Sequence, residues 1–245
     1  MSRPTLLGPL AAVSLIFAAV CALWLIVRPF GEVGVLTVSD LGTTAAAAWA
    51  TSLSLLAAIR SRSRIRLAWF LVASGLAAWT IAEGIWATYE MLLDREVPFP
   101  SPADVAYLAA YPLVGLGLVI VASPERSLAR LRTLLDGTAL VCAATAIVWH
   151  AILLPIYSDS DATWIEKTVG GAYPLGDLIL LFALALALYA NRSGRVGKVI
   201  TVFAIGMGIY MLADLAFAYL TLDDAFSSGT FVDLGWIFGY LMIGY

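Results

Sequence analysis

Long apolar stretches separated by short polar segments make up almost the whole of this chain. A membrane-spanning helix needs about 20 consecutive, mostly apolar residues. Stretches near that length occur at 6–27, 35–59, 67–92, 103–122, 134–157, 173–190, 199–220 and 230–245. The last stretch covers only about 24 Å at a rise of about 1.5 Å per residue, which is short of a hydrocarbon core of roughly 30 Å. The pattern predicts an all-α integral membrane protein of about eight transmembrane helices. We expect the eighth helix to be truncated at the last residue and the chain to be the front part of a longer protein.

The composition supports this interpretation. The 245 residues are 62% hydrophobic and 13% charged, with a mean hydropathy of +0.93, whereas a soluble domain averages about 45–50% apolar and about 25% charged residues. The net charge of −3 and the lack of a basic, aromatic-rich segment argue against a nucleic-acid partner. Cys21 and Cys142 fall in different apolar stretches and are interpreted as core residues.

The basic residues predict how the helices are oriented. Short cytoplasmic loops carry an excess of Lys and Arg, and here the basic residues gather in alternate polar segments. Eleven of the fourteen lie on one predicted side: Arg3, Arg60, Arg62, Arg64, Arg66, Arg126, Arg130, Arg132, Arg192, Arg195 and Lys198. We therefore expect both termini to be cytoplasmic and the acidic loops to face outward.

Several predicted helices open with the same local pattern, a hydroxyl residue followed three positions later by Asp. The pattern occurs at 37–40, 101–104, 133–136 and 230–233 and resembles a capping box. Another helix is expected to follow the segment 170–174 and to begin near Asp177. The repetition predicts four helical hairpins in series. Asp104, Asp177 and Asp233 are interpreted as helix caps that also line an outward-facing cavity.

Three ionisable residues are too deep in the apolar stretches to cap a helix: Glu83, His150 and Asp214. Counted from the cytoplasmic start of each helix, all three lie about 23–24 Å up, in the outer third of the membrane. A charge in hydrocarbon is costly, so such residues usually face the bundle interior and mark a functional site. The alternatives are a core histidine and acids whose hydrogen bonds lock helix packing.

Aromatic side chains accompany these residues at helical spacing. Trp79, Glu83, Trp86 and Glu90 recur at intervals of four, three and four, and therefore share one helical face. The sequence predicts an outward-opening pocket for an unknown small ligand or cation, although an interfacial aromatic belt remains an alternative for the aromatics. The candidate binding residues are Glu83, His150, Asp214, Trp79, Trp86, Glu90, Tyr107, Tyr111, Asp104, Asp177, Tyr210 and Asp233.

The chain lacks the motifs of several membrane chemistries. A retinal Schiff base needs an intramembrane lysine, and both Lys167 and Lys198 lie in or beside predicted loops. Bis-histidine haem ligation needs two histidines, and His150 is the only one. Nucleotide loops, HExxH and GxSxG are also absent. We therefore identify no cofactor, metal site or catalytic residue, and whether the parent protein is an enzyme stays open.

An ordered series of short motifs resembles a known family. The motifs lie at 84–90, 98–113, 132–137, 173–177 and 233–236, with Asp214 between the last two. Together, over about residues 69–245, they resemble the N-terminal multi-pass membrane region of bacterial, especially actinobacterial, GGDEF–EAL cyclic-di-GMP signalling proteins. No GGDEF or EAL motif is present, so no catalytic residue is carried over.

The resemblance implies a sensory input module that perceives an unknown extracytoplasmic or membrane signal. The signal would pass through the last helix to a cytoplasmic output domain beyond residue 245, and the protein would be a homodimer surrounded by membrane lipids. Two other functions remain open. One is a small transporter that uses the same acids as a proton or cation relay. The other is an intramembrane lipid-modifying enzyme, which would need His150 within hydrogen-bond reach of an acid.

Overall fold

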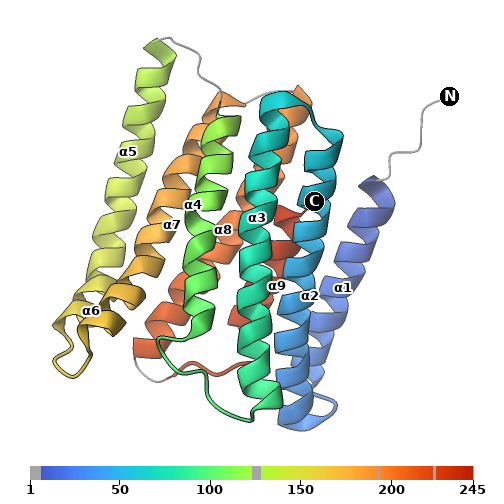
Figure 1. Ribbon diagram of the computed structural model, residues 1–245, viewed down its shortest axis with the longest axis vertical. Coiled ribbons are helices and arrows are strands. Elements are labelled where there is room, and N and C mark those ends of the chain that lie inside the picture. The colour runs from blue at the N-terminus through green and yellow to red at the C-terminus, as the bar shows by residue number, and fades with distance from the viewer. Residues whose placement is uncertain (1–6, 123–127, 192–193, 223–224, 245) are drawn as a thin grey trace.

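The computed structural model describes residues 7–122, 128–191, 194–222 and 225–244, and within these ranges it contains helices and no strands (Figure 1). The elements are α1 (Leu7–Val27), α2 (Gly31–Arg60), α3 (Ser63–Ala87), the π-helix η1 (Thr88–Leu92), α4 (Pro102–Val121), α5 (Leu128–Val148), the π-helix η2 (Trp149–Leu153), α6 (Leu154–Ser158), α7 (Trp164–Ala190), α8 (Gly194–Leu222) and α9 (Phe231–Ile243). Leu6 and Tyr245 of the predicted first and last helices lie outside the described residues, as do Arg3, Arg126 and Arg192.

The helices form one bundle in which α3 has the most extensive contacts, with α4 on one side and α2 on the other. The short helix α9 packs against α8 and α2, and α7 packs against α4 and α5. Figure 1 shows α1 and α5 at opposite edges of the bundle. The middle of the bundle, where buried residues must be held, is therefore built by α2, α3, α4, α7, α8 and α9.

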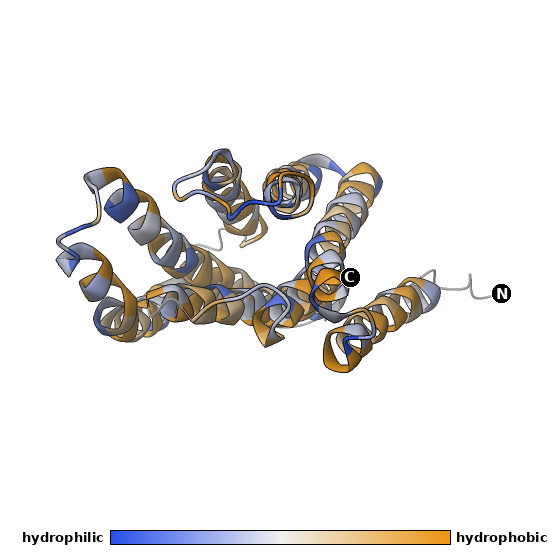
Figure 2. Cartoon of the chain, turned by 90° about the horizontal axis from the view of Figure 1, so that it is seen from below, coloured by the Kyte–Doolittle hydropathy of each residue, from blue (hydrophilic) through white to orange (hydrophobic). Residues whose placement is uncertain are grey.

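The outer surface is apolar, as a membrane requires. Ile26, Ile147 and Leu212 are 75%, 70% and 67% exposed, and apolar side chains exposed all around a bundle face lipid rather than water. Figure 2 shows apolar residues along the length of the helices, with hydrophilic residues among the loops and helix ends. Within the described residues, seven helical stretches are long and apolar enough to cross a membrane. The chain therefore has the character of a multi-pass membrane protein.

The eighth predicted span is the shortest. α9 has 13 residues, which cover about 20 Å. The hairpin repeat and the cytoplasmic position of both termini stay predictions.

Two of the predicted capping boxes are confirmed. At the start of α4, Ser101 Oγ accepts a hydrogen bond from the backbone N of Ala103 at 3.2 Å, and Asp104 accepts one from the backbone N of Ser101 at 2.5 Å. At the start of α9, Asp233 accepts from the backbone N of Thr230 at 2.8 Å. Both aspartates satisfy backbone donors that the first helical turn leaves without partners.

The other predicted helix starts are wrong. α2 begins at Gly31, so Thr37 and Asp40 lie inside the helix, and Thr37 Oγ1 donates to the carbonyl of Val33 at 2.7 Å. α5 begins by Leu128, which leaves Asp136 exposed beyond its first turn. The reason is that a hydroxyl group inside a helix can donate to the carbonyl four residues earlier, so a hydroxyl–x–x–Asp pattern does not by itself fix a helix start.

The start of α7 is also earlier than predicted. Thr163 caps the helix, because its backbone N donates to Glu166 at 2.6 Å and its Oγ1 accepts from the backbone N of Glu166 at 3.3 Å. Glu at this position closes a capping box more readily than Asp does. Gly170, Pro174 and Asp177 therefore all lie within α7, and Asp177 is not a helix cap.

The contact between α3 and α4 depends on two glycines. A Cβ built on Gly75 would lie 2.6 Å from Val114 Cγ2, and a Cβ on Gly117 would lie 2.7 Å from Val72 Cγ2 and 2.9 Å from the carbonyl of Ala68. Small residues at membrane helix interfaces allow such close backbone approach. The two glycines therefore set the distance between α3 and α4.

We predict that Gly117→Ala destabilises the bundle by about 1–3 kcal/mol, because the added methyl overpacks a closed interface. Gly84→Ala is the matched control on α3, since a Cβ there would meet no atom within 4 Å. It should be neutral or stabilising by up to about 1 kcal/mol, as expected for replacing a helical glycine. Unfolding of both variants in the same detergent checks the prediction, and equal stability would contradict the close packing described here.

Candidate functional site

A cavity of about 1370 Å³ opens at the end of the bundle where α3 connects to α4 and α8 connects to α9. Loop residues such as Glu96 and Ser228 line its mouth, and Trp79 and Tyr210 line its inner end. In Figure 1 this end lies at the bottom. The Lys and Arg pattern predicts it to be the outward end, so the cavity lies where the sequence places an extracytoplasmic pocket.

The lining is strongly acidic. Twelve Asp or Glu residues line the cavity, against three basic residues, Arg28, Arg95 and Lys167. Two of the three bases bond backbone carbonyls instead of carboxylates: Arg28 Nε donates to Leu25 at 3.4 Å and Lys167 Nζ donates to Tyr157 at 3.3 Å. The negative charge of the lining is thus left without a matching positive charge from these side chains.

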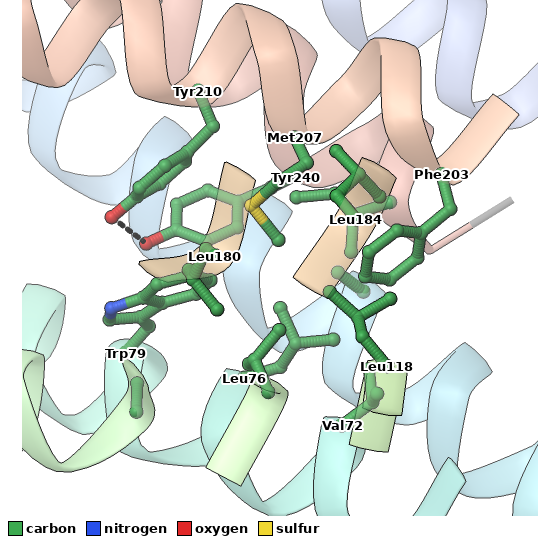
Figure 3. Packing of buried hydrophobic residues seen from close by; sticks show 14 of the residues in the cluster. Val72, Leu76, Trp79, Leu118, Leu180, Leu184, Phe203, Met207, Tyr210 and Tyr240 are labelled. Atoms are coloured by element: carbon green, nitrogen blue, oxygen red, sulfur yellow. Dashed lines mark hydrogen bonds between the residues drawn. The ribbon is translucent and has the colours of Figure 1, made fainter. Parts of the chain in front are cut away.

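Aromatic rings close the inner end of the cavity. Trp79 is 1% exposed and stacks on Tyr210 with ring centroids 4.7 Å apart, while Tyr111 and Tyr240 meet it edge-on at 6.1 and 6.0 Å. Figure 3 shows Trp79, Tyr210 and Tyr240 together, next to the aliphatic core that contains Leu76. The cavity therefore ends on an aromatic floor, and packed aliphatic core lies beyond it.

Glu83 is held at this floor by α9. Tyr240 Oη donates to Glu83 Oε1 at 2.9 Å, and the hydroxyls of Tyr240 and Tyr210 lie 3.3 Å apart. A hydroxyl has one hydrogen to donate. Tyr240 is the donor in both contacts, so its single hydrogen is shared between Glu83 and Tyr210. Hydroxyls from α8 and α9 thus meet beside the carboxylate of α3.

Asp214 is held in a similar way from two other helices. Trp236 Nε1 on α9 donates to Asp214 Oδ1 at 2.6 Å. Tyr111 Oη on α4 lies 3.4 Å from Asp214 Oδ2 and 3.1 Å from Asp177 Oδ1, so its single hydrogen is shared between two carboxylates. Neutral donors therefore orient both deep acids, and neither is paired with a basic side chain of the residues that the structure describes.

The acids nearer the mouth also have fixed partners. Tyr173 Oη donates to Asp104 Oδ1 at 2.5 Å, and Ser228 Oγ donates to Glu90 Oε1 at 3.1 Å. Ser39 on α2 donates to Asp233, which ties the start of α9 to α2. The helix caps Asp104 and Asp233 thus connect elements that are far apart in the sequence.

The structure brings most of the predicted site residues together. Ten of the twelve line the cavity: Glu83, Asp214, Trp79, Trp86, Glu90, Tyr107, Tyr111, Asp104, Tyr210 and Asp233. The four residues predicted to share one face of a helix are all among them. Asp177 does not line the cavity and instead lies behind Tyr111, buried within α7.

His150 does not join Glu83 and Asp214. It lies in η2 with an exposed side chain and does not line the cavity. Depth along a helix fixes the level of a residue but not its direction around the axis, and α5 lies at the edge of the bundle, where little surrounds it. The prediction that the three residues meet is therefore wrong for His150, and the lipid-modifying mechanism loses its histidine.

Sequence reasoning missed several cavity residues. Asp40 was interpreted as a cap, and only the earlier start of α2 places it inside the bundle. Trp236 and Tyr240 follow Asp233 at intervals of three and four, so one face of α9 carries all three residues. That spacing was a usable signal, although of Trp236 and Tyr240 only Trp236 lines the cavity. Phe217 shares a face with Tyr210 and Asp214 in the same way, at intervals of four and three. Tyr173 and Phe226 offered no comparable signal.

Comparison of the chain with known protein families, with characterised proteins and with solved structures finds no match. The description of the site therefore rests on the geometry of this chain.

We predict that Tyr240→Phe lowers the free energy of unfolding by about 1–2 kcal/mol, because Glu83 loses a donor in a buried position. Tyr219→Phe is the matched control, since Tyr219 is 53% exposed, and it should change stability by less than about 0.5 kcal/mol. Thermal unfolding of the two variants in lipid nanodiscs checks the difference. Equal effects would show that the bond to Glu83 contributes nothing.

Proposed function

We propose that this chain is a membrane-embedded sensory input module. Its cavity binds a small ligand from the extracytoplasmic side, and α9 passes the event to a cytoplasmic output domain. The observation that supports this proposal is the double role of α9, which lines the cavity with Trp236 and holds Glu83 through Tyr240 and Asp214 through Trp236. A ligand that contacts Glu83 and Asp214 therefore also perturbs the hydrogen bonds that hold α9 in place.

Coupling of this kind needs a ligand that binds one arrangement of the helices better than another. A ligand that donates hydrogen bonds to Glu83 or Asp214 competes with Tyr240 and Trp236 for the same oxygens. It thereby changes which position of α9 is favoured. The contacts of α9 with α8 and α2 then carry the change along the bundle.

We infer the nature of the output from the resemblance to GGDEF–EAL proteins. This resemblance supports an output domain for cyclic-di-GMP turnover, a homodimeric assembly and a location in a bacterial inner membrane. Within this chain we propose no catalytic role for any residue.

The transport alternative has less support in the packing. Leu76, Leu180 and Met207 are fully buried beyond the aromatic floor, and none of them lines the cavity. Side chains thus fill the region between the cavity and the opposite end of the bundle. A binding site with one entrance fits a sensor better than a conduction path.

We predict that Asp214→Asn speeds backbone hydrogen exchange in α9 about fivefold, because replacing one carboxylate oxygen by an amide weakens a hydrogen bond worth about 1 kcal/mol. Exchange at the α3–α4 interface should stay unchanged, which separates a local effect on α9 from general unfolding. Asp136→Asn, an exposed change on α5, serves as the control. Uniform changes in all helices, or none in α9, would contradict the proposed coupling.

A second prediction separates sensing from transport. Proteoliposomes that contain the chain should show no flux of H⁺, Na⁺ or K⁺ above that of protein-free vesicles, because no described path leads past Trp79. Glu83→Gln should leave this baseline unchanged. A flux that Glu83→Gln abolishes would replace the sensor with a proton or cation transporter.

A further inference from the structure

Asp40 and Glu90 form an acidic pair in the cavity wall that lacks a hydrogen donor. Asp40 is 6% exposed, and its Oδ2 accepts no hydrogen bond from the described residues. The same holds for Glu90 Oε2. The two carboxyl groups are near enough to interact electrostatically. Because a buried carboxylate oxygen without a donor is costly, this pair provides acceptors for a group that the chain itself does not supply.

The missing donor fits a ligand better than a metal ion. Among the described residues, no group of three or more His, Cys, Asp or Glu side chains is arranged to hold a metal. The basic residues of the lining do not fill the position either, since Arg28 and Lys167 bond backbone carbonyls. An N–H donor with a positive charge suits two adjacent carboxylates.

An aromatic wall continues directly from Glu90. Trp86 lies four residues before Glu90 and lines the same cavity, and the Trp86 ring lies 6.2 Å from Phe217. Phe217 in turn lies 4.7 Å from Phe226 and 5.6 Å from Trp236, centroid to centroid. Trp236 bonds Asp214 at the far end of this wall. Aromatic faces next to carboxylates attract a cation that has an apolar body.

We propose that the ligand of this cavity is an organic cation with a primary ammonium group and an apolar body. The ammonium group donates to Asp40 Oδ2 and Glu90 Oε2, and the body lies against the wall of Trp86, Phe217, Phe226 and Trp236. The inference rests on the proposed sensory function and names its ligand class. Such a ligand acts on α9 through the ring of Trp236, the donor of Asp214, and not by donating to Glu83 or Asp214 itself. A cavity of about 1370 Å³ has room for such a molecule, since drug-sized ligands occupy pockets of about 300–1,000 Å³.

A site that offers two carboxylate oxygens without donors should bind a cation that has N–H groups more tightly than one that has none. A site that recognises positive charge alone should bind both equally. Benzylamine and benzyltrimethylammonium carry the same charge on the same ring, but the second has no N–H to donate. Isothermal titration calorimetry of the chain in nanodiscs should give benzylamine a Kd at least about tenfold lower than that of benzyltrimethylammonium. Benzyl alcohol and phenylacetate, which share the ring without the positive charge, should bind more weakly still.

Two carboxamide variants locate the site. Glu90→Gln should weaken benzylamine binding by about tenfold, while Glu96→Gln, an exposed residue of the same lining with the same charge change, should have little effect. Equal effects of the two variants, or no binding of benzylamine, would overturn the inference. So would an unchanged affinity in Glu90→Gln, because Asp40 and Glu90 would then only share a proton.

Failure of the proposed ligand class and failure of the proposed sensory function give different results. Preferred binding of phenylacetate or benzyl alcohol would overturn the ligand class and leave the sensory role of the cavity in place. Ion flux, or α9 exchange that does not respond to Asp214→Asn, would overturn the sensory role whichever probe binds.

Discussion

Carboxylates held inside an apolar bundle need hydrogen donors, and this requirement organises the cavity half of the molecule. Glu83 and Asp214 are half-buried in transmembrane helices at the inner end of the cavity, so the bundle itself supplies hydrogen bonds that water supplies at an open surface. Their donors come from other helices: Tyr240 and Trp236 on α9, and Tyr111 on α4. The bond from Trp236 joins two consecutive helices, whereas those from Tyr240 and Tyr111 join helices that are distant in the sequence, so satisfying the acids also fixes where α9 and α4 lie.

The two ends of the bundle are packed by different principles. At one end, aliphatic side chains fill the interior, and the close approach of α3 and α4 at Gly75 and Gly117 leaves little space. At the other end, polar and aromatic side chains surround a cavity. The aromatic floor around Trp79 separates the two regions. In the proposed sensor, the packed end is the base against which a change at the cavity acts on α9.

The acids of the cavity serve two purposes. Asp104 and Asp233 complete helix starts and also accept bonds from Tyr173 and Ser39, so their main contribution is to hold helices together. Asp40 and Glu90 keep oxygens without a donor. An acid that costs stability and does not hold helices together is the better candidate for binding a ligand. Asp40 and Glu90 are acids of this kind.

From the amino-acid pattern alone, the helical class, the membrane character and ten residues of the cavity lining could be predicted. Apolar runs of about 20 residues leave few other folds open, and helical spacing alone placed Trp79, Glu83, Trp86 and Glu90 on one face. Tertiary structure decided what the pattern could not. Depth along a helix does not give direction around it, so His150 was placed wrongly. Local capping signals also occur inside helices, so the starts of α2 and α7, and with them the roles of Asp40 and Asp177, became visible only in the folded bundle. The donors of Glu83 and Asp214 lie up to 157 residues away in the chain, and only packing brings them together.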